Sequence, residues 1–308
     1  MGKYVTAAEA VQVVKSGDRV YVQAAAATPT ILTKALADRA SELRNVEVCH
    51  LHTEGDAPYA NPELAESFHV NSFFIGANVR HTLKAGNGSY TPVFLSELPL
   101  LFRKNVVKLD VAFIHVSPPD SHGYCSLGVS VEASVAAIEN AKIVIAQVNP
   151  QMPRTFGDGI LHVSEIDYLV EVNVPIYAHD VTPFTAEEEK IGTYVASLIE
   201  DKSTLQMGIG SIPNAALSKL TNHKDLGLHT EMFSDGVIDL IENDVINCNY
   251  KGTLRGRALA TFLMGSKRLY DFVDDNPFIE MKESSMVNDT ARIRRNPRMV
   301  AINSAIEV

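Results

Sequence analysis

A tetrapeptide that occurs twice constrains the fold of this chain more than any other feature. Residues 51–54 read LHTE, and residues 228–231 repeat the same four letters. Each copy follows an apolar strand, a loop of small residues, a proline (Pro29 or Pro213) and a helix with apolar periodicity. Matching tetrapeptides in matching surroundings predict that the chain contains two related α/β halves.

The bulk composition restricts the class of protein. A length of 308 residues leaves room for about two domains. The net charge of −10 argues against a nucleic-acid groove, which needs a basic stripe. The three cysteines are odd in number and far apart, which is typical of a reduced, cytoplasmic protein. No apolar run approaches membrane-spanning length. We therefore expect neither a nucleic-acid nor a membrane partner.

Strand-like runs alternate with helical patterns along the chain. Predicted strands cover residues 20–23, 46–52, 73–75, 111–116, 143–148, 175–177, 205–207, 227–230, 258–263 and 299–302. Predicted helices cover residues 7–15, 29–43, 131–140, 186–198, 213–220, 237–242 and 267–271. Strands separated by helices predict parallel sheets. Pro183 and an acidic helix start lie within residues 180–188, so we predict domains at 1–184 and 185–308.

A glycine-containing turn follows the strand of the second copy, at residues 208–213 (GIGSIP). Glycines let the backbone approach a ligand, Ser211 is a possible N-cap residue, and the N–H groups of a helix start attract anions. A tight turn without any ligand has the same composition. The spacing alone leaves both interpretations open.

Glu231 stands at the end of the strand that follows this turn. Open α/β sheets bind ligands at the carboxyl ends of their strands, and a carboxylate there can serve as a covalent nucleophile. A solvated glutamate at a strand end is the common alternative. The residues by themselves favour that second interpretation.

Two rival sites have sequence support. His50, His52 and Glu54 share one face of a predicted strand, and two histidines with a carboxylate can bind a metal ion. A polar strand end is the other interpretation, and we prefer it. Cys125 and His122 suggest a thiol nucleophile, but no third group is present to orient them. We expect Cys125 to be inert.

The last predicted strand, residues 299–302, reads as a core strand, and the chain stops soon after it at Val308. A domain seldom ends directly after a buried strand with nothing to cover it. The sequence therefore predicts either that these 308 residues are a fragment or that a partner located elsewhere covers the strand.

Several motifs together resemble the acetyl-CoA hydrolase/transferase family of class I CoA-transferases, within which 4-hydroxybutyrate CoA-transferases are the most similar. These motifs are residues 117–128, 149–167 (with FGDG at 156–159), 206–217, 229–236 and 299–308. The resemblance implies two similar open α/β domains with mainly parallel sheets, the second one truncated. It also implies a further C-terminal segment that carries a second glycine-rich turn.

The resemblance assigns roles to residues as well. It implies that Glu231 is the catalytic carboxylate and that the backbone around Gln206 helps to hold an oxyanion. The residues expected to contact CoA are Gly208, Ile209, Gly210, Ser211 and Ile212, with Asn303 and Ile306 near the CoA. It implies no metal and no permanently bound cofactor, because coenzyme A is a substrate.

The expected activity is the transfer of CoA between a short-chain acyl-CoA (4-hydroxybutyryl- or butyryl-CoA) and a carboxylate such as acetate. The resemblance implies a ping-pong reaction through a glutamyl-CoA thioester, in a homodimer. An acyl-CoA hydrolase shares nearly all of these motifs and is the main alternative. A metal-dependent enzyme and a non-catalytic binding domain on the same scaffold are the others.

Overall fold

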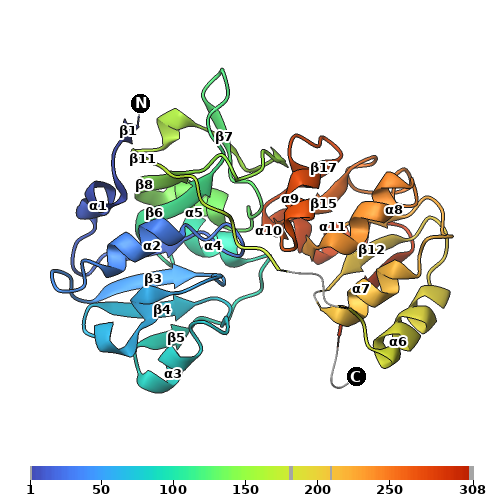
Figure 1. The fold of residues 1–308 in the computed structure, drawn as a ribbon, viewed down its shortest axis with the longest axis horizontal. Helices are drawn as coiled ribbons and strands as arrows, with labels where there is room; N and C mark the ends of the chain where they lie inside the picture. The colour runs from blue at the N-terminus through green and yellow to red at the C-terminus, as the bar shows by residue number, and fades with distance from the viewer. Residues whose placement is uncertain (1, 180–182, 209, 305–308) are drawn as a thin grey trace.

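A computed structural model describes residues 2–179, 183–208 and 210–304. The described chain forms two lobes joined by an extended connection before α6 (Figure 1). Both lobes contain parallel sheets covered by helices, so the predicted fold class, two open α/β domains with mainly parallel sheets, is confirmed. The division at 184/185 stays a prediction.

One eight-stranded sheet forms the centre of the N-terminal lobe, and every neighbouring pair in it is parallel. In spatial order its strands are β1 (Lys3–Tyr4), β11 (Tyr168–Glu171), β8 (Ala141–Val148), β6 (Leu109–Val116), β2 (Arg19–Val22), β3 (Val46–His50), β4 (Phe68–Ser72) and β5 (Gly88–Tyr90). A two-stranded antiparallel pair, β7 (Tyr124–Ser126) with β10 (Ile160–His162), projects from this lobe.

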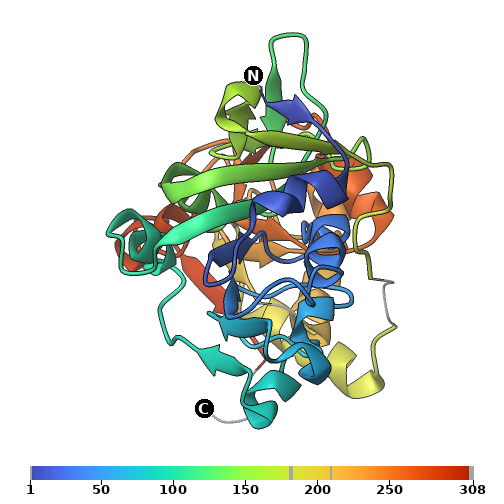
Figure 2. The ribbon, with the colours of Figure 1, turned by 90° about the vertical axis from the view of Figure 1, so that its left-hand side faces the viewer.

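Helices cover both faces of the large sheet, as Figure 2 shows from the outer side of this lobe. They are α1 (Ala7–Ala10), α2 (Thr30–Ala37), α3 (His81–Ala85), α4 (Leu98–Arg103) and α5 (Ser134–Asn140), with 3₁₀ turns η1 (Val11–Val13), η2 (Pro58–Ala60), η3 (Pro62–Leu64) and η4 (Val163–Glu165). Val20 and Val22 pack with Leu32 of α2, whereas Tyr21 points to the other face and meets the ring of Phe102 at 5.6 Å. Both faces are buried, which explains why these strands are continuously apolar.

The C-terminal lobe contains three small parallel sheets. Their strands are β13 (Gly227–Leu228), β12 (Thr204–Met207) and β18 (Met299–Ile302); β14 (Met232–Phe233) and β16 (Phe262–Leu263); and β15 (Ala258–Ala260), β17 (Ile279–Met281) and β9 (Phe156–Gly157). Its helices are α6 (Ala186–Ser197), α7 (Ser211–Ser218), α8 (Ile238–Glu242), α9 (Lys267–Val273), α10 (Ser284–Val287) and α11 (Thr290–Ile293), with the 3₁₀ turn η5 (Asp235–Val237). No helix in the described part of the chain is long and apolar enough to cross a membrane.

The sheets bear out the two-halves prediction. Strand β2 runs between β3 and β6, and strand β12 runs between β13 and β18, with parallel pairing throughout. In each half the central strand leads into the turn and helix of the repeat (α2 or α7), and the next strand leads into LHTE. The two repeated segments therefore occupy equivalent places in their sheets.

Three predicted elements are wrong in position. The strand predicted at 73–75 lies instead at β4, and Phe73, beyond the end of that strand, packs against Phe102. Residues 175–177 form no strand, because Pro175 lacks the N–H that a ladder requires. The strand in this part of the chain is β11, which ends earlier, at Glu171. The run 258–263 is two strands, which pair with different neighbours.

Strand β18 agrees with its predicted range. It pairs with β12 on one side and has no second neighbour among the described strands. Ile302 is buried, but Ala301 is exposed and Val300 is partly exposed. The expectation that the cover of this strand lies elsewhere stays a prediction.

Glu132 is buried beside the contact between the lobes. It accepts hydrogen bonds from the hydroxyls of Tyr21 (2.7 Å), Ser130 (2.7 Å) and Ser134 (3.1 Å). Burial raises the pKa of Glu132, and these hydrogen bonds oppose that rise. The backbone of the same residue accepts from the N–H of Ser284, at the start of α10, at 2.9 Å. The carboxyl group of Glu132 thus binds residues of the N-terminal lobe, and its backbone carbonyl binds a helix of the other lobe.

We expect Glu132→Ala to lower the free energy of unfolding by about 3 kcal/mol, because it leaves three buried hydroxyls without their acceptor. Urea unfolding measures the change. The control is Glu139→Ala, which removes an exposed carboxylate paired with Arg103 and should cost under about 1 kcal/mol. Equal losses in the two variants would contradict the role of Glu132 as a buried acceptor.

Candidate active site

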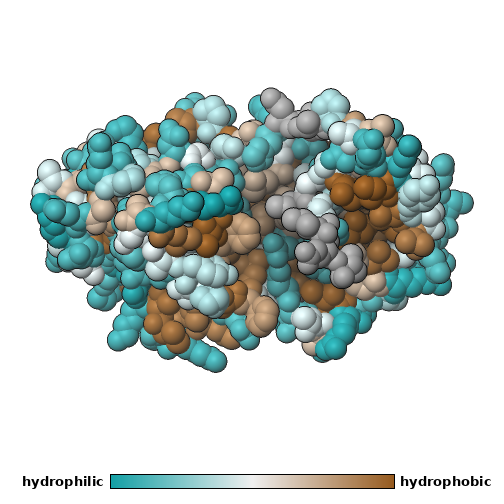
Figure 3. All heavy atoms as spheres, turned by 90° about the horizontal axis from the view of Figure 1, so that it is seen from below, coloured by the Kyte–Doolittle hydropathy of each residue, from teal (hydrophilic) through white to brown (hydrophobic). Residues whose placement is uncertain are grey.

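A cavity of about 1090 Å³ lies between the lobes. The N-terminal lobe contributes an apolar wall, formed by Leu51, Phe73, Phe74, Ile75, Val93, Leu95 and Leu98. The C-terminal lobe contributes mainly small and polar residues. Seen from below, apolar surface lies on both lobes beside the boundary between them (Figure 3). One side of the cavity therefore suits an apolar chain and the other suits polar chemistry.

The glycine turn between β12 and α7 forms part of the polar side. A Cβ at Gly208 would stand 2.0 Å from Oδ1 of Asn303 and 3.0 Å from the carbonyl oxygen of Ile302, so the side chain of Asn303 would have to move to admit one. Gly210 has φ of 111° and ψ of −179°, a region that is essentially restricted to glycine. The conformation of the turn thus requires glycine at position 210, whatever the turn binds.

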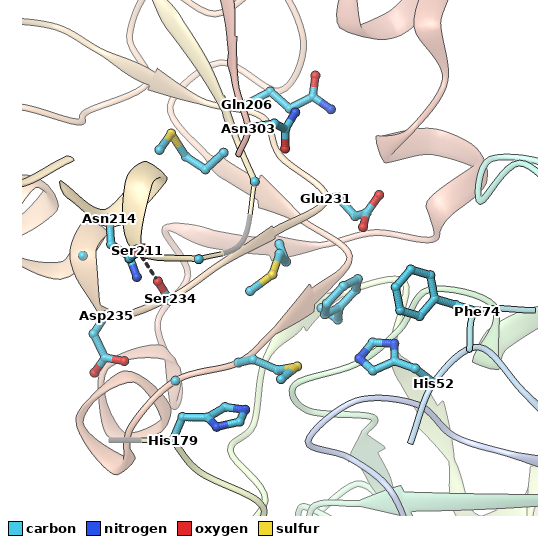
Figure 4. A pocket seen from close by; sticks show the side chains of 18 of the residues that line it. His52, Phe74, His179, Gln206, Ser211, Asn214, Glu231, Ser234, Asp235 and Asn303 are labelled. Carbon is cyan, nitrogen blue, oxygen red and sulfur yellow. Dashed lines mark hydrogen bonds between the residues drawn. The ribbon is translucent and has the colours of Figure 1, made fainter. Parts of the chain in front are cut away.

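Ser211 does not act as the predicted N-cap. Helix α7 begins at Ser211 itself, the residue before it is Gly210, and no side chain caps the helix. The hydroxyl of Ser211 instead donates to the carboxylate of Glu188 in the first turn of α6. Deeper in the cavity, the hydroxyl of Ser234 donates to the side-chain oxygen of Asn214 at 2.8 Å, which Figure 4 shows as a dashed line.

Glu231 reaches the cavity because its neighbours are fixed to β12. The N–H of His229 donates to the carbonyl of Leu205 at 3.0 Å. The hydroxyl of Thr230 accepts from the N–H of Met207 at 2.9 Å and lies 2.8 Å from the same residue's carbonyl. These bonds hold the tetrapeptide beside the end of β12, and Glu231 extends from it into the cavity (Figure 4).

The carboxylate of Glu231 is half-buried and accepts one hydrogen bond, from Nδ2 of Asn288 at 2.6 Å. Burial raises the pKa of this carboxyl group, and the hydrogen bond from Asn288 acts in the opposite direction. No cationic side chain of the described residues forms an ion pair with it. A desolvated carboxylate held by a neutral donor is available for attack on an electrophile.

The glutamate of the first copy lines the same cavity. The N–H of Glu54 donates to the hydroxyl of Thr28 at 3.0 Å, and burial raises the pKa of its carboxyl group. Nearby, the ring of His52 lies between those of Phe74 and Phe262, with centroids at 5.8 and 5.5 Å. The two copies of LHTE therefore face one cavity from opposite lobes.

The structure brings most of the predicted site residues together. The cavity is lined by Gln206, Gly208, Gly210, Ser211, Glu231 and Asn303. Ile212 is not part of the lining. Ile209 and Ile306 lie outside the described residues. The sequence analysis missed Asn288, because an asparagine 57 residues away from Glu231 carries no local signal.

The rival sites do not form. The ring of His50 is buried, neither of its nitrogens has a hydrogen-bond partner, and burial lowers its pKa to about 4. Across the described residues, no three His, Cys, Asp or Glu side chains gather as a metal site, so His50, His52 and Glu54 supply no ligand set. Burial raises the pKa of Cys125 to about 11, which fits an inert thiol.

Comparison with known proteins identifies the family of the chain. The family model for the acetyl-CoA hydrolase/transferase N-terminal domain matches residues 1–178, and that for the C-terminal domain matches residues 265–308. The chain belongs to the acetyl-CoA hydrolase/transferase family. The resemblance inferred from the motifs is therefore confirmed.

Individual members of the family are similar over nearly the whole chain. A succinyl-CoA:acetate/propanoyl-CoA:succinate CoA transferase from Fasciola hepatica is 45% identical over 96% of this chain and 62% of its own length. A 4-hydroxybutyrate coenzyme A transferase from Clostridium kluyveri is 44% identical over 99% of this chain and 71% of its own length. The chain thus spans about two thirds of the length of these relatives.

Solved structures of the family share the fold. A 4-hydroxybutyrate CoA-transferase from Porphyromonas gingivalis superimposes with a TM-score of 0.88, at 39% identity over 99% of this chain and 74% of its own. RipA from Yersinia pestis superimposes with a TM-score of 0.93, at 33% identity over 98% of this chain and 73% of its own.

The backbone geometry of the glycine turn leads to a stability prediction. We expect Gly210→Ala to lower the free energy of unfolding by about 2 kcal/mol, because its φ and ψ suit only glycine. Gly256→Ala is the matched control: its φ of 74° has open space around it, and the cost should be about 1 kcal/mol. Thermal unfolding of both variants measures the difference. A fully stable Gly210→Ala variant would show that the turn adopts another conformation.

Proposed function

We propose that this chain forms the catalytic centre of a CoA-transferase. It moves CoA between a short-chain acyl-CoA, such as 4-hydroxybutyryl- or butyryl-CoA, and a carboxylate such as acetate. The observation that carries the proposal is the place of Glu231: a half-buried carboxylate, held by one neutral donor, in the wall of a cavity beside a glycine turn. Membership of the family supports it.

In the proposed reaction this carboxylate is the nucleophile toward the two substrates. An oxygen of Glu231 attacks the thioester carbonyl, a mixed anhydride forms, and CoA leaves as the thiolate. The thiolate attacks the glutamyl carbonyl of the anhydride, which releases the first carboxylic acid as its carboxylate and leaves a glutamyl-CoA thioester. A second carboxylate reverses these steps and departs as the new acyl-CoA. The sequence is ping-pong covalent catalysis.

Each step builds negative charge on a carbonyl oxygen, so fixed donors are required. We assign this role to the backbone around Gln206, which lines the cavity where β12 leads into the glycine turn. Loss of one such donor typically costs about 3 kcal/mol of transition-state stabilisation. Gly208, Gly210, Ser211 and Asn303 form the adjacent surface, to which we assign the CoA. We also assign Ile209, Ile212 and Ile306 to the CoA site, and that assignment rests on the family resemblance alone.

The apolar wall supports a short acyl chain in the acyl-CoA substrate. Phe73, Val93 and Leu98 present hydrocarbon to the cavity opposite the glycine turn. A chain of a few carbons that binds there gains about 25 cal/mol of favourable free energy for each Å² of apolar surface removed from water. The names of the relatives include acetate, propanoyl, succinate and 4-hydroxybutyrate, all of them short-chain groups.

Acyl-CoA hydrolysis is the second candidate. Acetyl-CoA hydrolases are among the relatives, at 24–26% identity, whereas the CoA-transferases reach 45%. That difference favours transfer. Release of CoA from acyl-CoA, measured with and without acetate, separates the two reactions, because a hydrolase needs no acceptor and a transferase does.

The assembly and the cellular compartment are also proposals. We propose a homodimer, the commonest symmetric assembly of soluble proteins, in the cytoplasm. Cys49, Cys125 and Cys248 are all free and buried, which supports a reducing compartment. Coenzyme A acts as a substrate in this proposal and is not a resident cofactor.

The nucleophile can be tested directly. We expect Glu231→Gln to abolish transfer with little effect on unfolding, because an amide cannot form the anhydride. Borohydride reduction of the acyl-CoA-treated protein should modify Glu231 in the parent protein and nowhere in the variant. Peptide mass spectrometry locates the modification.

Glu54→Gln is the matched control, since it changes the equivalent glutamate of the other repeat in the same cavity. We expect a much smaller effect on transfer. Parental turnover in Glu231→Gln, or an adduct on Glu54, would move the nucleophile to another residue.

A further inference from the structure

We propose that the guanidinium of Arg80 binds a phosphate of coenzyme A where the cavity opens to solvent. The inference rests on the proposed function and adds a binding residue to it. Arg80 is the only lysine or arginine among the described residues that line the cavity. Its side chain forms no ion pair and no hydrogen bond within the described chain. A free guanidinium in the wall of a ligand cavity is suited to an oxyanion that the ligand supplies.

The backbone on both sides of Arg80 is held in place, although its own side chain is not. Nδ2 of Asn78, two residues earlier, donates to the carbonyl of Thr53 at 2.9 Å. Nε2 of His81, the next residue, lies 2.9 Å from the carbonyl of Ala60. The point from which the guanidinium extends is therefore fixed to the segment that follows β3. Only the side chain has to be ordered when an anion binds, which limits the entropic cost.

The depth of the lining residues orients a long ligand. Glu231 is half-buried, whereas Arg80 is exposed and directly precedes α3, which lies at the lower end of the N-terminal lobe in Figures 1 and 2. An acyl-CoA carries its thioester at one end and its phosphates at the other. In the proposed reaction the thioester must reach Glu231, and the phosphates stay near water because burial of charge is costly. Arg80 is thus placed for the phosphate end.

Carboxyl groups line the same cavity and leave Arg80 unpaired. They belong to Glu54, Glu231, Asp235 and Asp239. Asp239 already pairs at 2.6 Å with Arg268, which does not line the cavity. The chain as a whole has a net charge of −10. A cleft lined by carboxylates repels a ligand with several negative charges, so a single cation at its opening has a large share in binding that ligand.

An oxyanion at Arg80 has two possible sources, a phosphate of CoA and the carboxylate that accepts the CoA. Both can form parallel hydrogen bonds with a guanidinium. The carboxylate of the acceptor reacts at Glu231 in the proposed reaction, and acetate has no second charged group. Bound at Glu231, acetate leaves Arg80 free. We therefore assign the phosphate to Arg80.

Binding measurements test the assignment without catalysis. Isothermal titration calorimetry gives the affinity of the protein for CoA and for pantetheine, which lacks the nucleotide and all phosphates. We expect Arg80→Gln to weaken the binding of CoA about tenfold, the equivalent of one hydrogen bond to a charged group. The affinity for pantetheine should stay unchanged. Arg80→Lys keeps the charge and should lose less than Arg80→Gln.

Lys84→Gln is the matched control. Lys84 lies in α3, four residues after Arg80, and it is exposed but does not line the cavity. Its substitution removes the same charge from the same surface, so the affinity for CoA should stay at the parental value. Equal weakening in Arg80→Gln and Lys84→Gln would overturn a direct contact, because net charge alone would then explain the loss.

Steady-state kinetics separate the two sources of the oxyanion. Arg80→Gln should raise the KM for acyl-CoA about tenfold and leave the KM for acetate unchanged. Added salt should weaken CoA binding less in Arg80→Gln than in the parent protein, because one screened charge pair is missing. A raised KM for acetate with parental affinity for CoA would overturn the assignment to phosphate.

The remaining outcomes distinguish this inference from the proposed function. An adduct on Glu231 together with parental CoA affinity in Arg80→Gln overturns the role of Arg80 and leaves the proposed function in place. Weaker CoA binding in Arg80→Gln, in a protein whose parent forms no adduct, supports the contact and overturns the proposed function. A parent protein that binds neither CoA nor pantetheine overturns both. If Arg80→Gln fails to fold, Arg80→Ala provides the same comparison.

Discussion

Parallel strand pairing is the constraint on which the rest of this structure depends. In a parallel sheet all strands end at one edge, so the segments that follow them gather there. The turns after β2 and β12 and the LHTE segments after β3 and β13 all lie at such edges, and the two edges face one another across one cavity. Glu54 and Glu231 meet there although 177 positions separate them in the chain (231 minus 54).

The two halves have diverged at equivalent positions. The first turn is built from alanines and Thr28, whose hydroxyl accepts the N–H of Glu54, and Ala25 takes a φ of 54° there. The second turn has Gly208 and Gly210, which line the cavity beside Glu231. The two copies therefore place different backbone next to equivalent glutamates.

Coupling between the lobes passes through a short run of C-terminal residues. Glu132 and Leu95 hold Ser284 from the N-terminal side, and Asn288, four positions later, holds the carboxylate of Glu231. A shift of the N-terminal lobe must therefore act on the nucleophile as well as on the apolar wall. Hydrogen bonds set this coupling, and their geometry tolerates only small displacements before the interaction weakens.

The sequence by itself determined the duplicated α/β architecture, because apolar periodicity and the repeated LHTE are local signals, and it also determined the family. It predicted that Glu231 and the glycine turn belong to one site. It misplaced the strand at 73–75, where Phe73 packs against Phe102 beyond the end of β4. It also misplaced the cap at Ser211, whose hydroxyl bonds to Glu188 instead. Only the tertiary structure revealed Asn288 and the apolar wall, because contacts across 57 residues or between lobes leave no trace in local pattern. Local physics fixes which elements form, and the side chains that meet at a cavity are fixed only once those elements pack.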